Sequence, residues 1–114
     1  MGVIQEKSED FALNIVKLYQ YLSNEKNEYV MSKQLLRSGT SIGANVAEAQ
    51  YAQSKADFSS KMSIALKEAG ETRYWLKLLH KSDYYKDEAI VNDCIEIIKI
   101  LTAIVSNSKV ENKL

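Results

Sequence analysis

Residues 54–79 read SKADFSSKMSIALKEAGETRYWLKLL, and this stretch decides the predicted fold. Ser54 is a favourable helix N-cap, and Asp57 stands three residues later, where a capping box places its acidic residue. Apolar and small residues then recur at spacings of four and three, a heptad-like stripe suited to packing against other helices. The stripe consists of Phe58, Met62, Ala65, Ala69, Thr72, Leu76 and Leu79. We therefore expect a long amphipathic helix over residues 55–81.

Three further segments show helical periodicity, and they predict helices over residues 4–23, 28–52 and 87–107. Their inner stripes are Ile4, Phe11, Ile15, Leu18 and Leu22, then Leu35, Ile42, Val46 and Ala49, and finally Ile90, Cys94, Ile97, Leu101 and Ile104. Gly39 and Gly43 weaken the second helix locally, because glycine costs about 1 kcal/mol relative to alanine inside a helix.

Short connections force consecutive helices to be antiparallel neighbours. The sequence therefore predicts an all-α fold, an antiparallel up-down-up-down four-helix bundle that forms one domain over residues 1–114. Asp87 is a plausible cap for the last helix, and the polar tail from Ser106 is expected to fray.

Composition excludes several classes of protein. The chain has 114 residues, with 15 Lys plus Arg against 15 Asp plus Glu, and 46% of its residues are hydrophobic. These values fit one globular domain and argue against a disordered chain or a strongly basic nucleic-acid binder. The single cysteine, Cys94, excludes a disulfide framework and a cysteine zinc cage, and the single histidine, His80, excludes a His-rich metal site.

Targeting signals are not evident in the sequence. The N-terminal residues 1–6 lack the basic and long apolar regions of a signal peptide, and Glu6 stands where a myristoylation signal requires Ser or Thr. No apolar run approaches the roughly 18 residues of a membrane helix. We therefore expect a cytoplasmic protein with no membrane partner.

The third predicted helix carries apolar residues outside its inner stripe. Ile64, Trp75 and Leu78 lie well away from Phe58 and Leu76 at about 100 degrees per residue. A tryptophan at such a position indicates a second contact surface, because aromatic anchors are enriched in protein interfaces. Self-association is the favoured interpretation, and the alternative is that Trp75 covers an edge of the bundle.

The second predicted helix also has a second face, which combines polar and small residues. Its members are Arg37, Ser41, Ala44, Asn45 and Glu48, with Gly43 and Ala47 beside them. Small side chains allow another helix to approach closely, and Arg37 could then bind a carboxylate across the contact. The alternative is a solvated face on which alanine serves helix propensity.

These two helices resemble a known family. The relevant stretches are LRSGTSIGANVAEA at 36–49, SKADF at 54–58 and IALKEAGET at 64–72. They resemble the four-helix-bundle proteins first noticed in intervening sequences of bacterial 23S rRNA genes, in which an Arg-Ser-x-x-Ser-Ile-Pro-x-Asn-Ile-Ala-Glu-Gly run opens the second helix. The matching residues are Arg37, Ser41, Asn45 and Glu48, whereas Gly43 replaces the usual proline and Ala49 the usual glycine.

The resemblance implies an antiparallel bundle that assembles as a homopentamer, with the motif at or near subunit contacts. It also implies a relationship to accessory proteins of diversity-generating retroelements, which use a basic pentameric barrel to bind a reverse transcriptase and RNA. The zero net charge of this chain departs from that branch. Phosphate binding relies on accumulated Lys and Arg, so the departure weakens the inference of nucleic-acid binding.

The sequence leaves two candidate functions for this protein. The leading one is a non-enzymatic homo-oligomeric scaffold of unknown biochemical role, whose interface residues are Arg37, Ser41, Asn45, Glu48, Ile64 and Trp75. The alternative is binding of RNA, or service to a reverse transcriptase, through a basic patch on the ring, made of Lys33, Arg37, Lys55, Lys61 and Arg73.

An enzyme is the weakest interpretation. His80 is better explained as a cation at a helix C-terminus, and Cys94 as a buried small hydrophobe. Glu48, Glu68 and Glu71 could suggest a carboxylate metal site, but the Glu-x-x-His pairs of such bundles are missing. No catalytic residue, cofactor or metal is predicted.

Overall fold

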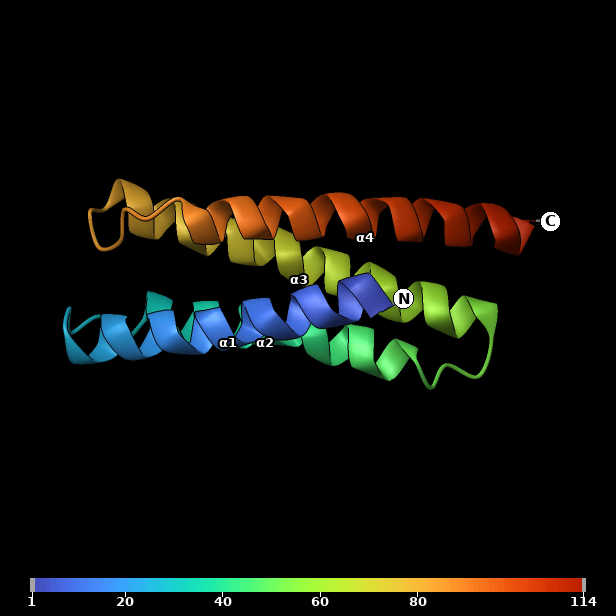
Figure 1. Cartoon of the computed structure of the whole chain (residues 1–114), viewed down its shortest axis with the longest axis horizontal. Helices are drawn as coiled ribbons and strands as arrows, with labels where there is room; N and C mark the ends of the chain where they lie inside the picture. Colours follow the sequence, from blue (N-terminus) through green and yellow to red (C-terminus); the bar gives the residue numbers. More distant parts are fainter. Residues whose placement is uncertain (1, 114) are drawn as a thin grey trace.

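The computed structural model describes residues 2–113 of the chain, with side chains as far as Ser108. It contains helices α1 (Gly2–Asn24), α2 (Met31–Ala49), α3 (Lys55–Lys81) and α4 (Ala89–Lys113). Consecutive helices run in opposite directions along a rod of 50 × 22 × 21 Å (Figure 1). The predicted all-α, up-down-up-down four-helix bundle is confirmed.

One continuous core fills the space between the helices, and it consists of the predicted inner stripes. Burial of these stripes removes apolar surface from water, which is the main driving force for folding. Three positions differ in detail: Phe58 and Ile104 are only half-buried, and Val105 is buried near the end of α4. The largest fully buried side chains include Ile15, Leu22, Leu35, Ile42, Met62, Leu79 and Leu101.

The four helices do not pack equally closely. α2 packs closely against both α1 and α3, and α3 packs closely against α4, whereas α1 and α4 form a looser pair. The helices therefore follow one another around the bundle axis in chain order. As a result, the seam between α2 and α3 and the seam between α1 and α4 lie on opposite sides of the molecule (Figure 1).

Two glycines allow α1 and α2 to approach closely. A Cβ atom on Gly39 would lie 2.8 Å from Cγ1 of Ile15, and one on Gly43 would lie 3.3 Å from the backbone oxygen of Ser8. The first distance is a clash and the second is tighter than usual. The glycines that weaken the predicted helix are thus sites where α1 packs onto it.

The ends of α2 differ from the prediction of residues 28–52. The helix begins at Met31 because the carboxylate of Glu28 accepts hydrogen bonds from the backbone N–H groups of Val30, Met31 and Ser32, at 3.2, 3.2 and 2.7 Å. These groups have no partner within the helix, so a carboxylate is favourable there. Glu28 therefore acts as a buried cap before the helix.

The ends of α3 agree with the prediction. The side chain of Ser54 accepts a hydrogen bond from the backbone N–H of Asp57 at 3.0 Å, and Asp57 in turn accepts one from the backbone N–H of Gln53 at 3.1 Å. The capping interaction expected from the sequence is confirmed, although the reciprocal donor is Gln53 and not Ser54 itself.

The last helix is longer than predicted. Asp87 caps it as expected, since its carboxylate accepts from the backbone N–H of Ala89 at 2.9 Å. The predicted end at residue 107 is too early, because α4 continues to Lys113 and Ser108 is buried. Within residues 2–113, no helix combines the length and the apolar composition needed to cross a bilayer.

Candidate functional site

The outer seam between α2 and α3 gathers all six residues predicted for an interface. Arg37, Ser41, Asn45 and Glu48 follow one line of α2, and Ile64 and Trp75 lie on the facing line of α3. Ion pairs cross the seam at both ends of these lines: Arg37 contacts Glu68 and Glu71, and Lys61 contacts Glu48. We call this set of residues the α2–α3 surface.

Arg37 is at the centre of a polar network on this surface. Its guanidinium group lies 3.3 Å from Oε2 of Glu68, forms a second ion pair with Glu71, and donates to Oε1 of Gln34 at 3.3 Å. The Arg37 side chain is 49% exposed, so water weakens these ion pairs and their contribution to stability is small. They bring the guanidinium group of α2 against two carboxylates of α3.

Trp75 is joined to the same network. Its indole N–H donates to Oε2 of Glu71 at 2.9 Å, and its ring meets Tyr74 edge to face at 5.2 Å between centroids. One side of the ring packs against the core, so the residue is half-buried. Glu71 thus holds both Arg37 and Trp75, while Ile64 remains exposed.

The remaining two predicted residues bond within their own helix. The hydroxyl of Ser41 donates to the carbonyl of Arg37 at 2.6 Å, and the side-chain amide of Asn45 donates to the carbonyl of Ser41 at 2.8 Å. Both side chains are half-buried. They therefore line the seam without linking α2 to α3.

The glutamates Glu68 and Glu71 have a role that the sequence alone did not indicate. Glu68 and Glu71 were considered only as metal ligands, and in the described part of the chain no group of three or more candidate ligands is close enough to hold a metal ion. The spacing of Lys61, Ile64, Glu68, Glu71 and Trp75, three and four residues apart, is the signal that places them on one stripe beside α2.

The small residues of α2 have a partner within the chain. Gly39 and Gly43 face α1, as described above, and Ala44 and Ala47 line a shallow hollow between α1 and α2. The helix that approaches these two glycines is α1 of the same chain, so they do not support the expected contact with another subunit.

The five residues predicted for nucleic-acid binding do not gather on a single chain. Arg37 and Lys61 are paired with carboxylates. Lys33 lies at the start of α2 and Lys55 at the start of α3, which are at opposite ends of the rod (Figure 1). Only Arg73 belongs to a cationic cluster.

That cluster lies between α3 and α4 and was missed by the sequence analysis. Arg73, Lys77, His80 and Lys81 line a hollow of about 220 Å³ together with Glu88 and Val91. The spacing of Arg73, Lys77 and Lys81 at intervals of four is the signal that could have identified it.

Cys94 occupies the position expected of a structural residue. It is fully buried, and its thiol donates to the carbonyl of Ala69 at 3.5 Å. Burial raises the pKa of the thiol to about 12. The neutral thiol is therefore the form present near neutral pH, and the thiolate required of a nucleophile is disfavoured.

A family model described as 23S rRNA-intervening sequence protein matches residues 3–103. A crystal structure from Bacteroides thetaiotaomicron VPI-5482, of a protein with unknown function from the S23 ribosomal protein family, is 56% identical to this chain with a TM-score of 0.88. The match covers 90% of this chain and 97% of that one. No curated protein matches the chain significantly.

Proposed function

This chain belongs to the 23S rRNA-intervening sequence protein family, and on that basis we propose that it is a non-enzymatic, homo-oligomeric scaffold that acts by binding other molecules. The observation that carries the proposal is the α2–α3 surface. It combines an exposed isoleucine, a half-buried tryptophan and an arginine held by two carboxylates.

The chemistry of this surface favours a protein contact. Tryptophan and arginine are the side chains most enriched where interfaces gain their binding energy. Because Glu71 already holds both Arg37 and Trp75, little side-chain entropy is lost when another subunit packs on them. The exposed Ile64 provides apolar area between the two sets of ion pairs.

The proposed assembly is a homopentamer, the state that the family resemblance implies. A ring of identical subunits has cyclic symmetry, so each subunit uses two different surfaces for its two neighbours. The α2–α3 surface supplies one of these two. The single cysteine, which is buried and un-ionised, fits a reducing compartment, and we place the protein in the cytoplasm.

Charge substitution on the surface tests the proposal. We expect Ile64→Glu and Trp75→Glu to lower the solution mass measured by sedimentation equilibrium. Each substitution would place a carboxylate in the contact between subunits, and burial of an unpaired charge is unfavourable. Leu13→Glu is the matched control, since Leu13 is an exposed apolar residue on α1 and the variant carries the same charge change. Circular dichroism checks that each variant is folded. An unchanged mass for both variants would exclude this surface from the assembly.

RNA binding, or service to a reverse transcriptase, is the second candidate function. The observation that favours it is the cluster of Arg73, Lys77, His80 and Lys81 between α3 and α4. The five basic residues predicted from the sequence do not favour it, because they are dispersed over the chain. We expect Arg73→Glu/Lys77→Glu to weaken a salt-dependent complex with a short single-stranded RNA more than Lys33→Glu/Lys55→Glu does, as measured by fluorescence anisotropy. Equal affinity of both double variants and the wild-type protein would reject it.

A further inference from the structure

The hollow between α3 and α4 is lined by a row of like charges. Arg73, Lys77 and Lys81 follow one another at intervals of four, so they share one face of α3 over about 12 Å. The half-buried His80 lines the same hollow, and Glu88 is the one carboxylate among its lining residues. The hollow lies at the end of the rod where α3 ends and α4 begins (Figure 1). We call it the α3–α4 hollow.

The row lacks counter-charges. Within the described part of the chain, Arg73, Lys77 and Lys81 form no ion pair. None of their neighbours three or four positions away in the sequence is acidic. Asp83, in the turn that follows α3, is held by Lys86 at 2.6 Å. Like charges four residues apart destabilise a helix, so the row lowers the stability of the free protein, and a bound anion would relieve the repulsion.

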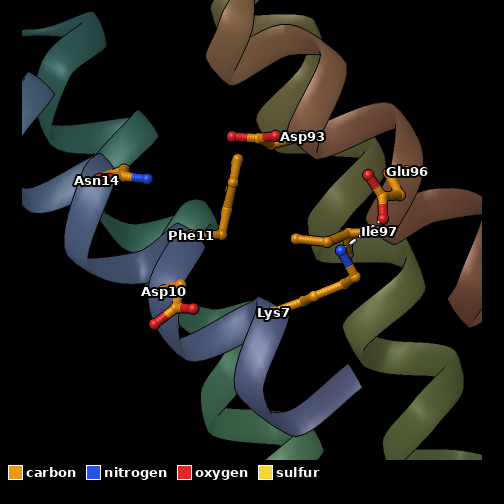
Figure 2. A pocket seen from close by; sticks show the side chains of 7 residues that line it. All are labelled: Lys7, Asp10, Phe11, Asn14, Asp93, Glu96 and Ile97. Atoms are coloured by element: carbon orange, nitrogen blue, oxygen red, sulfur yellow. Dashed lines mark ion pairs between the residues drawn. The ribbon is translucent and has the colours of Figure 1, made fainter. Parts of the chain in front are cut away.

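Two other seams of the bundle are built differently. Between α1 and α4, cations and carboxylates are mixed: Lys7 is paired with Glu96, and Asp10 and Asp93 line the same hollow (Figure 2). On the α2–α3 surface, Arg37 is held by two glutamates. Of these three seams, as far as the structure describes them, only the α3–α4 hollow gathers cations in excess.

The helix macrodipole explains only part of the row. Cations in the last turn of a helix interact favourably with its macrodipole, and this accounts for His80 and Lys81 at the end of α3. The effect falls off within that turn. Arg73 and Lys77 lie about two turns and about one turn before the end, so they need another explanation.

The chemistry of the hollow fits a single phosphate group. The guanidinium group of an arginine can bind two oxygens of a phosphate at once, and lysine amines add point charges. Three permanent cations against the carboxylate of Glu88 leave an excess of two positive charges. A phosphomonoester carries about 1.5 to 2 negative charges near neutral pH, whereas each phosphate of a nucleic-acid backbone carries one. The charge of the hollow therefore matches a monoester better than a diester.

We propose that the α3–α4 hollow binds a phosphomonoester. Arg73 and Lys77 bind the phosphate oxygens, and the carbon part of the ligand rests on the half-buried Val91 of α4. Two sources carry this chemistry. One is the 5′-phosphate end of an RNA, in which case the proposal rests on the second candidate function above, and the other is a small nucleotide, which does not require that function.

A second copy of this chain fits the hollow less well. Charged side chains, lysine among them, are depleted in the cores of subunit interfaces. A standard contact also covers about 800 Å² of each partner, far more than a hollow of about 220 Å³ at one end of the rod provides.

The test uses three ligands that share one base and one sugar. Adenosine 5′-monophosphate is a phosphomonoester, cyclic adenosine 3′,5′-monophosphate is a diester, and adenosine has no phosphate. Titration of the isotope-labelled protein, followed by amide chemical shifts, gives the Kd and locates the site. We expect the monoester to shift signals of residues 73–81 and 88–91 and to bind at least about fivefold more tightly than the diester. Adenosine should not bind.

Matched double variants test the residues. Arg73→Gln/Lys77→Gln should raise the Kd of adenosine 5′-monophosphate at least about tenfold, because it removes two of the three permanent cations. Lys33→Gln/Lys55→Gln removes the same charge outside the hollow and should leave the Kd close to the wild-type value. All four residues are exposed, so both variants should remain folded, and circular dichroism checks this.

A short RNA made with a 5′-phosphate and with a 5′-hydroxyl distinguishes the two sources. Tighter binding of the phosphorylated RNA than of the mononucleotide supports the proposal together with the second candidate function. Binding of the mononucleotide with no affinity for either RNA supports the proposal and rejects that function. Equal binding of the two RNAs without binding of the mononucleotide supports that function and overturns the proposal.

Four further results would overturn the proposal. These are the absence of mononucleotide binding at low salt, equal affinity for the monoester and the diester, equal loss of affinity in the two double variants, and chemical shift changes confined to other surfaces. A lower solution mass of Arg73→Gln/Lys77→Gln without ligand would show that a second copy covers the hollow, and would also reject it.

Discussion

Gly39 shows how one residue sets the distance between two helices. Viewed along the sequence, a glycine inside a helix is only a local weakness. In the structure its missing side chain is the space that the fully buried Ile15 occupies. The sequence pattern could not show whether Gly39 only weakens its helix or makes room for a neighbouring side chain. Periodicity identifies which face of a helix is buried, but it does not identify the atoms of other helices that contact that face.

We expect Gly39→Ala to lower the free energy of unfolding. The added Cβ would lie 2.8 Å from Cγ1 of Ile15, and overpacking of this kind costs about 1 to 3 kcal/mol, which outweighs the gain of up to about 1 kcal/mol in helix propensity. Gly70→Ala is the matched control, because the new Cβ meets no atom within 4 Å apart from the backbone of its own helix and its chain neighbours, and it should stabilise the protein. Urea denaturation measures both values. Equal stabilisation by the two substitutions would contradict the close packing of α1 on α2.

Cys94 was predicted to be a buried small hydrophobe, and the structure confirms its burial. Because burial raises the pKa of the thiol to about 12, we expect a thiol-specific reagent to react slowly with the folded protein near neutral pH. The same reagent should react rapidly after unfolding in guanidinium chloride. Rapid reaction of the folded protein would show that the thiol is accessible.

The raised pKa of Cys94 also predicts a dependence of stability on pH. The thiol of the unfolded chain ionises near its ordinary pKa of about 8.5, whereas the folded chain keeps its proton to about 12. The unfolded state therefore loses its proton first, and the contribution of the thiol to stability falls as the pH rises between these values. We expect the wild-type protein to lose more stability than Cys94→Ala over this range. If the free energy of unfolding of the two proteins changed equally with pH over this range, the raised pKa of the Cys94 thiol would be contradicted.

At the scale of elements, the interiors of the helices were predictable and some of their ends were not. The heptad-like stripe of α3 identified its core face, and Ser54 identified its start. The start of α2 was missed because its cap is Glu28, which is not a usual N-cap residue type and which reaches forward from the preceding connection to the first turn of the helix. The continuation of α4 to Lys113 was missed because polar composition was taken to indicate fraying.

Glu28 provides the prediction at this scale. We expect Glu28→Ala to lower the free energy of unfolding by about 1 to 2 kcal/mol, because it leaves three backbone N–H groups at the start of α2 without their carboxylate partner. Glu25→Ala is the control, since Glu25 is exposed in the same turn. Urea denaturation provides the comparison. A loss in Glu25→Ala as large as that in Glu28→Ala would argue against the cap.

The candidate site on α2 and α3 could be predicted only in part from the sequence. All six residues chosen from the sequence lie on the α2–α3 surface, because helical spacing determines which side chains share a face. The partners of Arg37 and Trp75 were not identified, since Glu68 and Glu71 meet Arg37 only when α3 is placed beside α2. Spacing along one helix does not specify contacts between helices.

At the scale of the whole molecule, the bundle was predictable and the unequal spacing of its helices was not. Four amphipathic stripes and short turns lead to one antiparallel arrangement. Gly39 and Gly43 admit α1 close to α2, whereas α1 and α4 form a looser pair with charged residues such as Asp10 and Asp93 along their contact.

The solution mass of the purified wild-type protein tests the central claim of assembly most directly. Light scattering on a size-exclusion peak gives this mass, and the ultraviolet absorbance ratio of the same peak reports any bound nucleic acid. We predict a particle free of nucleic acid with about five times the 12.9 kDa mass of one chain. A mass of 12.9 kDa would contradict the proposed assembly and return Trp75 to the role of covering an edge of the bundle.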